Sequence, residues 1–537
     1  MNKLLRAAVA ALLLSSGPAA AAGAPPKLAV IVVVDQMRAD YIDRFKADWT
    51  GGLHRLVEEG AWFQQAAYPY LSTFTCAGHA TISTGAYPHR HGVFQNGWWD
   101  RDVERQMTCT QDLHAADISY GVEVNGGDSA HRLAVPTFTD VMRTEHHAHV
   151  VSLSLKDRSA VMLGGHGGDA VTWLSNSLDA WVTSSVYANG PVPQVKKFVD
   201  ANPTTADFDK TWERMLPLER YSGPDAGLAE AAPPGWTSTF PHPLKAASVK
   251  PDLAYFTRWE RSPFADAYLG RFAAALAESF HLGTHDHTDV LTVSFSSPDL
   301  VGHAFGPRSH EIQDMYAHLD LTLGLLFERL DALVGRDQWV VGLTADHGVT
   351  PIPEQLVAEG HDAGRFSTPG VTAALEKVLT PALGDGKHVA VVDSNDIYFH
   401  PGVYRKIAKS ATLLKDVMAA VAAQPGVLRV FRHEELTAAA AASNDTLLRA
   451  AALSYFPGRG GDLILALKPG WMFSANGTTH GSASQDDQRV PILIMGRGVK
   501  HGVYREPASP ADVAPTLAAL SGVTLRKAEG HPLPCLE

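Results

Sequence analysis

The sequence predicts an α/β fold, a doubly wound and mostly parallel sheet with helices on both faces and inserted cap segments. Three apolar, β-branched runs carry this prediction: residues 28–34, 290–295 and 339–343. Unbroken hydrophobicity without alternation is typical of parallel strands that are buried on both faces. Between the second and third runs, apolar residues recur at helical spacing from Ile312 to Leu330,. Strands that alternate with helices indicate a doubly wound sheet.

The amino terminus predicts a signal peptide over residues 1–22. Lys3 and Arg6 give a basic start, residues 7–14 are apolar, and residues 18–23 are mostly small, as a signal peptidase prefers,. The apolar run is shorter than the roughly 20 residues that span a bilayer, so we expect no membrane anchor. The mature chain, residues 23–537, is therefore predicted to be periplasmic or secreted.

The composition, net charge and cysteine count indicate which kinds of protein and partner to expect. Hydrophobic residues make up 45% and charged residues 19% of the chain, which is ordinary for a globular protein,. A net charge of −12 gives no indication of a nucleic-acid-binding role,. The three cysteines, Cys76, Cys109 and Cys535, allow one disulfide and one free thiol, but the sequence does not choose the pair,.

Two regions are interpreted as insertions over the site. Residues 170–280 are rich in Pro, Trp and Tyr and have weak periodicity, and residues 352–478 contain a second α/β pattern. The second region includes a predicted helix over residues 411–423 and an alanine-rich stretch over residues 438–442. After it, the apolar run 490–495 returns the chain to the main sheet.

The last helix begins at Ser509-Pro510-Ala511-Asp512, whose residue types are favoured at helix starts,. It is predicted to continue through Leu517 and Leu520. This helix completes the set expected to cover the sheet.

Acidic and histidine side chains follow the predicted strands. In a doubly wound sheet, ligands bind beyond the carboxyl ends of the strands, so these side chains should converge. An Asp after a strand is usually a turn or capping residue, but the whole set is hard to explain in that way. Nitrogen and oxygen ligands without thiolates suit zinc, with manganese or iron as alternatives. The candidate metal ligands are Asp35, Asp299, His303, Asp346, His347 and His480.

Thr75 is the candidate nucleophile. It lies just before a predicted helix over residues 77–83, and the amino end of a helix favours an anion such as phosphate,. When this segment is taken alone, a simple helix cap by Thr75 explains it better. Cys76 is a rival nucleophile, but a metal site can activate a hydroxyl without a thiol.

The ordered set of these residues resembles the alkaline phosphatase and nucleotide pyrophosphatase/phosphodiesterase superfamily. The match covers about residues 28–165, 288–350 and 477–522. The resemblance implies two zinc ions per chain. It implies that one ion is held by Asp35, Thr75, Asp346 and His347, and the other by Asp299, His303 and His480.

Asn96, Lys156 and Arg158 indicate one branch of that superfamily. They resemble the asparagine and the Lys-x-Arg pair of threonine-type (phosphate-irrepressible) bacterial alkaline phosphatases, which contact the phosphoryl oxygens. Two cations and an amide suit the dianion of a phosphate monoester. The predicted activity is therefore hydrolysis of small-molecule phosphate monoesters through a phosphothreonine intermediate.

Three other functions remain as alternatives. A phosphodiesterase or nucleotide pyrophosphatase would use the same metals, but Lys156 and Arg158 count against it. A sulfatase needs a Cys/Ser-x-Pro-x-Arg signature, which the segment after Cys76 lacks. A catalytically dead phosphate-binding protein would not need every ligand.

A calcium site over residues 393–396 is conceivable, although an Asx-rich turn explains that segment,. The sequence leaves the physiological substrate and the oligomeric state open.

Overall fold

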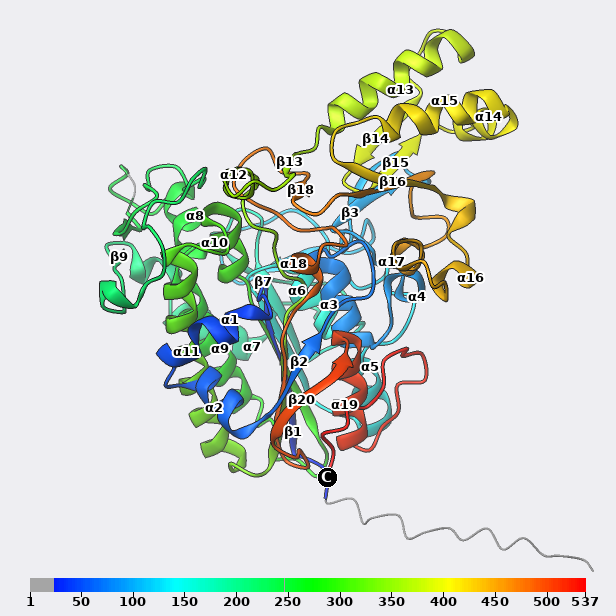
Figure 1. Ribbon diagram of the computed structural model, residues 1–537. Coiled ribbons are helices and arrows are strands. Elements are labelled where there is room, and N and C mark those ends of the chain that lie inside the picture. The colour runs from blue at the N-terminus through cyan, green and yellow to red at the C-terminus, as the bar shows by residue number, and fades with distance from the viewer. Residues whose placement is uncertain (1–23, 246) are drawn as a thin grey trace, which may run out of the picture.

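A ten-stranded sheet lies at the centre of the computed structural model, which describes residues 24–245 and 247–537 (Figure 1). Its strands follow one another across the sheet in an order that differs from their order in the chain. From edge to edge they are β20 (Gly502–Ala508), β2 (Ala61–Ala66), β19 (Ile492–Gly496), β12 (Trp339–Thr344), β1 (Leu28–Val34), β11 (Asp289–Phe295), β6 (Val150–Ser154), β7 (Ala170–Leu174), β8 (Trp181–Ser184) and β5 (Asp117–Ser119).

The middle of this sheet is parallel, which confirms the predicted fold class. Strands β12, β1, β11, β6 and β7 run in one direction, whereas β19 runs antiparallel to β12 and β2. All seven residues of β1 are fully buried. Its side chains alternate between two separate cores, with Val30 and Val32 in one and Ile31 and Val33 in the other. A strand that is covered on both faces therefore reads as unbroken hydrophobicity.

Helices cover both faces of the sheet (Figure 1). One face is covered by α2 (Gly52–Glu59), α9 (Pro263–Ser279) and α11 (His310–Val334), and α2 and α9 each pack against α11. The other face carries α3 (Thr75–Thr84), α5 (Phe138–His146), α6 (Asp157–Gly164) and α19 (Val513–Leu520), the last preceded by the short turn Pro510–Asp512. Helix α10 (Ser297–Phe305) follows β11 directly.

The first predicted insertion begins later than expected. Residues 170–174 and 181–184 form β7 and β8 of the main sheet, and α9 packs against α11. The segment between β8 and α9 is mostly irregular, with α7 (Pro193–Ala201), α8 (Leu253–Glu260) and the two-residue strands β9 (Thr211–Trp212) and β10 (His242–Pro243). Strands of four or five residues are too short to show a clear period, which is why the sequence did not separate them from the insertion.

The second predicted insertion contains a sheet of its own (Figure 1, yellow). Its strand order is β14 (Val389–Asp393), β15 (Asp396–Phe399), β17 (Leu463–Leu467) and β16 (Val427–Arg432). Helices α13 (Thr368–Leu383), α14 (Val403–Lys409) and α15 (Ala411–Ala422) cover it around a separate apolar core. The alanine-rich stretch forms the short helix α16 (Ala438–Ala441), followed by α17 (Thr446–Ser454).

The predicted signal peptide, residues 1–22, lies outside the described residues. Among the helices that are described, none combines the length and the apolar character needed to cross a membrane.

Candidate metal centre

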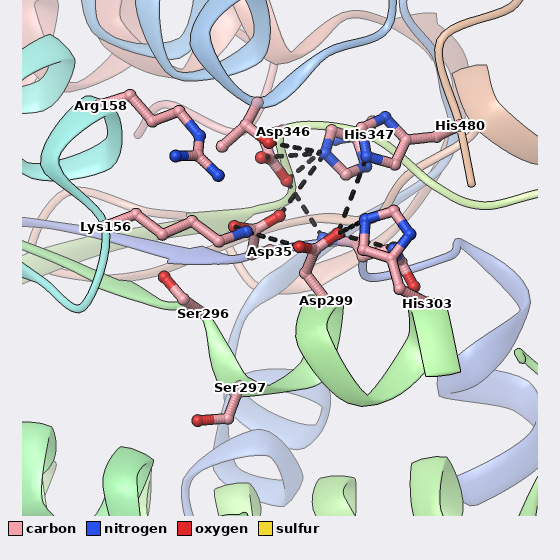
Figure 2. A network of polar contacts seen from close by, with 12 residues as sticks. Asp35, Lys156, Arg158, Ser296, Ser297, Asp299, His303, Asp346, His347 and His480 are labelled. Atoms are coloured by element: carbon pink, nitrogen blue, oxygen red, sulfur yellow. Dashed lines mark hydrogen bonds and ion pairs between the residues drawn. The ribbon is translucent and has the colours of Figure 1, made fainter. Parts of the chain in front are cut away.

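Three buried carboxylates meet at the carboxyl ends of adjacent strands (Figure 2). Asp35 follows β1 and Asp346 follows β12, while Asp299 lies in the first turn of α10 after β11. Because β12, β1 and β11 are neighbours and run parallel, their carboxyl ends lie side by side. The sheet therefore brings Asp35 together with two acids that lie more than 260 residues later in the chain.

Three histidines face these acids with the same ring nitrogen. The Nδ1 atoms of His303, His347 and His480 lie 2.8, 3.0 and 2.7 Å from the backbone oxygens of Thr478, Gly348 and Thr73. A hydrogen bond from Nδ1–H to a carbonyl fixes the ring and leaves Nε2 free to bind a metal. Each histidine is thus oriented as a ligand.

The side chains form two overlapping groups that could each hold an ion. Asp35, Asp346 and His347 form one group, and Asp299, His347 and His480 form the other, with the ligand atoms of each group within 4.8 Å of one another. His303 lies outside these groups, but its Nε2 is 3.1 Å from Asp299 Oδ1. The buried atoms Asp35 Oδ1 and Asp346 Oδ2 have no hydrogen-bond partner among the described residues. Buried charged oxygens without partners are costly, so this donor set fits a bound cation.

The three carboxylates lie close together with few positive charges nearby, and this shifts their pKa values. Burial, together with Asp299 and Asp346, raises the pKa of Asp35 well above its ordinary value. Burial acts on Asp299 too, but His303 and Lys156 outweigh it and hold the pKa of Asp299 well below the ordinary value. Two divalent cations would supply the charge that keeps all three carboxylates ionised.

Thr75 lies at the first position of α3 and faces this ligand set. Its Oγ1 is 3.3 Å from His347 Nε2, and the side chain is almost fully buried. The helix cap is Phe74, which makes no side-chain capping bond, so the hydroxyl of Thr75 is not used as a cap. A Cβ at Gly78 would overlap the backbone of Asp346, so glycine is what lets α3 approach the end of β12.

Asn96 is fixed next to the nucleophile at both its side chain and its backbone. Its Oδ1 accepts the backbone N–H of Cys76 at 2.9 Å, and its backbone oxygen accepts that of Cys109 at 3.0 Å. Cys76 and Cys109 form a disulfide, and Cys535 is a buried free thiol. The structure thus chooses the pair that the sequence left open, and a disulfide-bonded Cys76 is not an available nucleophile.

Lys156 contacts two of the candidate metal ligands in the structure. Its ammonium bridges Asp35 Oδ2 at 2.6 Å and Asp299 Oδ2 at 2.5 Å (Figure 2). Burial opposes its charge, but Asp299 and Asp35 raise the pKa of Lys156 above its ordinary value. Lys156 makes these two contacts because buried carboxylates attract the nearest mobile cation.

Arg158 lies near the same centre, on the first turn of α6 (Figure 2). Its one ion pair within residues 24–245 and 247–537 is with Asp157 Oδ1 at 3.3 Å, and its side chain is 30% exposed. Arg158 and Asn96 both line a cavity of about 390 Å³. The guanidinium therefore has free donors beside the Asn96 amide.

Two positioning residues were not predicted. Gln36 donates its backbone N–H to Asp346 Oδ1 at 3.1 Å and its side-chain amide to Asp299 Oδ1 at 2.6 Å. It does so at a φ of 68°, which non-glycine residues rarely adopt, and no sequence pattern announces such a position,. His79 joins Thr75 O at 2.9 Å to Ser294 Oγ at 2.8 Å, one turn after Thr75 on α3. A histidine within a small-residue helix was the only signal for it.

The conceivable calcium segment forms the turn between β14 and β15. Asp393 Oδ2 accepts a hydrogen bond from Gln106 at 2.8 Å, and Asp396 Oδ1 and Oδ2 accept from Gly461 N and Gln95. These carboxylates are used by protein donors, which favours the turn interpretation.

The fold and the site define a class of protein: an enzyme with a doubly wound sheet in which candidate metal ligands surround a hydroxyl at the start of a helix. The chain belongs to the type I phosphodiesterase / nucleotide pyrophosphatase family, whose sequence pattern matches residues 29–489. This confirms the resemblance to the alkaline phosphatase superfamily.

Its relatives include several alkaline phosphatases. The chain is 31% identical to alkaline phosphatase PhoV of Synechococcus elongatus, over 91% of this chain and 88% of that one. It is 32% identical to alkaline phosphatase PhoK of a Sphingomonas species, over 91% and 87%. A crystal structure of alkaline phosphatase PafA, in which a threonine, an asparagine, a lysine and an arginine are substituted, superposes with a TM-score of 0.88 at 28% identity. That match covers 95% of this chain and 99% of the other.

Proposed function

We propose that this protein is an alkaline phosphatase that hydrolyses phosphate monoesters, with Thr75 as the nucleophile and two zinc ions bound by the ligand set. The observation that supports the proposal is that Thr75, Lys156 and Arg158 lie beside the candidate metal ligands, with Asn96 bonded to the backbone next to Thr75. The PafA variant that resembles this chain substitutes the same four residue types in the same order, which supports the assignment.

The resemblance implies how the ligands would divide between the two ions. Asp35, Thr75, Asp346 and His347 would hold one ion, and Asp299, His303 and His480 the other. The bound ions would supply Lewis acidity, which lowers the pKa of a hydroxyl and stabilises a leaving oxygen. The two proposed ion sites are adjacent, because the ring of His347 at one site stacks on that of His480 at the other, with 3.4 Å between centroids.

The residues of the chain carry out two displacements at phosphorus. In the first, Thr75 Oγ1 bonds to phosphorus as the bond from phosphorus to the alcohol oxygen breaks, and the proton given up by Thr75 is balanced by the proton that the released alcohol takes from solvent. In the second, water attacks the phosphothreonine and releases phosphate and the free Thr75 hydroxyl. The start of α3 favours the negative charge that builds up there. Phosphoryl transfer depends mainly on positioning and charge, which this rigid buried site supplies.

Asn96, Lys156 and Arg158 would hold the oxygens of the phosphoryl group. Once divalent ions neutralise Asp35 and Asp299, the Lys156 ammonium no longer has to compensate two carboxylates and can turn to a phosphoryl oxygen. Arg158 already has donors free toward the cavity beside Asn96. A monoester dianion uses all of these donors, whereas a diester presents an ester group in place of one anionic oxygen.

A phosphodiesterase or nucleotide pyrophosphatase is the second candidate function, because the family as a whole is described by those activities. It uses the same ligand set and the same nucleophile. The cationic pair Lys156 and Arg158 favours the monoesterase over it.

The assignment of Thr75 is tested by trapping labelled phosphate on the protein. Thr75→Ala should abolish both the covalent label and nearly all turnover, whereas Thr75→Ser should keep a measurable part of each. Thr84→Ala is the matched control, because this hydroxyl lies at the other end of the same helix and bonds only within its own turn. Label that persists in Thr75→Ala would overturn the assignment.

We also propose that the protein is exported, to the periplasm or the medium. The predicted signal peptide and the Cys76–Cys109 disulfide support this, because disulfides persist in oxidising compartments,. Alkylation of thiols in freshly isolated protein should modify Cys535 alone after denaturation. Modification of all three cysteines would contradict export.

A further inference from the structure

A cluster of three histidines lies at the opposite end of the sheet from the metal centre. His149 directly precedes β6, and His285 and His287 lie in the loop that leads into β11. Strands β6 and β11 are parallel neighbours, so their amino ends bring these residues together. Strand β11 has seven residues, which at about 3.3 Å each puts roughly 20 Å between the cluster and Asp299,.

The three rings present their nitrogens to one another. One ligand atom from each histidine lies within 4.8 Å of the others. Ring centroids of His149 and His285 are 4.5 Å apart, and those of His285 and His287 are 5.5 Å apart with nearly parallel planes. Two nitrogens that share a zinc ion at about 2.1 Å each lie at most about 4.2 Å apart, so small ring rotations complete the geometry. The side chains are 29–40% exposed, which leaves solvent access.

Carboxylates behind the rings orient them in the way that metal ligands are oriented. Asp289, which is fully buried, has Oδ2 2.6 Å from His285 Nδ1, and Asp169 has Oδ1 3.3 Å from His149 Nδ1. The Nε2 atoms of these two rings are left available. His287 Nε2 is buried and lies 3.2 Å from the other oxygen of Asp289, Oδ1, which leaves Nδ1 of this ring for a metal. Histidines backed by carboxylates are a recurrent arrangement around zinc.

We propose that His149, His285 and His287 bind a third divalent metal ion of the zinc, nickel or copper class. Three imidazoles without thiolates suit these ions, and a water or a solute can occupy the remaining position. The ion cross-links the loop before β11 to the start of β6, and Asp289 and Asp169 offset its charge. Because this site lies far from the proposed phosphate-binding residues, its role is to bind metal and stabilise the amino ends of β6 and β11, independently of the proposed activity.

The test compares His287→Asn and a His285→Asn/His287→Asn double variant with wild type and with His281→Asn. His281 is the matched control, because it is exposed on the same loop and its φ of 53° suits asparagine,. Each untagged, full-length protein is equilibrated with zinc and gel-filtered, and its bound metal is counted by mass spectrometry. Each is also passed over a nickel resin, and its melting temperature is measured with and without added zinc.

Wild type and His281→Asn should carry about one zinc more per chain than either cluster variant, bind the nickel resin more tightly, and gain melting temperature from zinc that the variants do not gain. The difference between proteins is the readout, so it does not depend on how many ions the catalytic centre holds. His287→Asn keeps the Asp289–His285 contact and so guards against simple misfolding. Equal metal content and equal elution across all four proteins would overturn the proposal.

Discussion

Removal of Lys156 and Arg158 should harm the hydrolysis of a monoester far more than that of the matching methyl diester. The two cations differ in their surroundings. Lys156 is 8% exposed and Arg158 is 30% exposed, so solvent screens the arginine more. A hydrogen bond to a charged group contributes about 1.5–3 kcal/mol, so we assign about 3 kcal/mol to Lys156 and about 1.5 kcal/mol to Arg158.

Together these contributions amount to about 4.5 kcal/mol, or roughly three powers of ten in kcat/KM for the monoester. The assay measures kcat/KM on both substrates for wild type, each single Ala variant and the double variant. Lys156→Ala should cost more than Arg158→Ala, and Asn96→Ala should cost less than Lys156→Ala because it removes a neutral donor. Because both variants act near one group, the two losses need not add.

Zinc content must be measured on the same samples, because Lys156 contacts Asp35 and Asp299. Loss of metal would reduce activity on both substrates equally and would not report on phosphate recognition. With zinc retained, an equal fractional loss on monoester and diester would refute the reasoning. The phosphodiesterase function would then be favoured.

Three further predictions concern metal, charge and cross-linking. Chelation should abolish activity and added zinc should restore it, and His303→Ala should retain fewer ions than wild type by metal analysis; full activity in metal-free protein would exclude the proposed centre. Burial raises the pKa of Asp266 to about 7, so its folded pKa exceeds its unfolded value of 3.8 and stability is lost as pH rises between these values,. Asp266→Asn should therefore gain melting temperature relative to wild type, by an amount that grows up to about pH 7 and then levels, and a difference independent of pH would contradict this. The Cys76→Ala/Cys109→Ala variant loses a cross-link over 33 residues, which should cost about 3–4 kcal/mol in denaturant unfolding, yet its phosphate should still attach to Thr75,.

Much of the fold and site could be predicted because the relevant signals are local. An apolar run followed by an acid needs only a few residues, so β1 with Asp35 and β12 with Asp346 could be identified directly. The direction of β19 could not be predicted, since an apolar run carries no information about whether its neighbours are parallel. The same holds for the disulfide, whose partners are set by the approach of distant segments.

Lys156 shows a different limit of sequence reasoning. Its motif predicts that it is a cation near phosphate, but its partners depend on the balance of charge in the assembled site. Three buried carboxylates set that balance, and they come from strands far apart in the chain. Gln36 is similar, because its strained backbone is stabilised only by the acids that it contacts,.

The anchoring of Asn96 has a consequence for the entropy of substrate binding. Both its side chain and its backbone are held by the two halves of one disulfide. Folding and disulfide formation have therefore already restricted the conformations of Asn96 before a substrate arrives. Ordering a loose side chain on binding costs about 0.5–1.5 kcal/mol, a cost that this arrangement moves from each catalytic cycle to the single event of folding. Asn96 can then contact the transition state without first having to be ordered by the substrate.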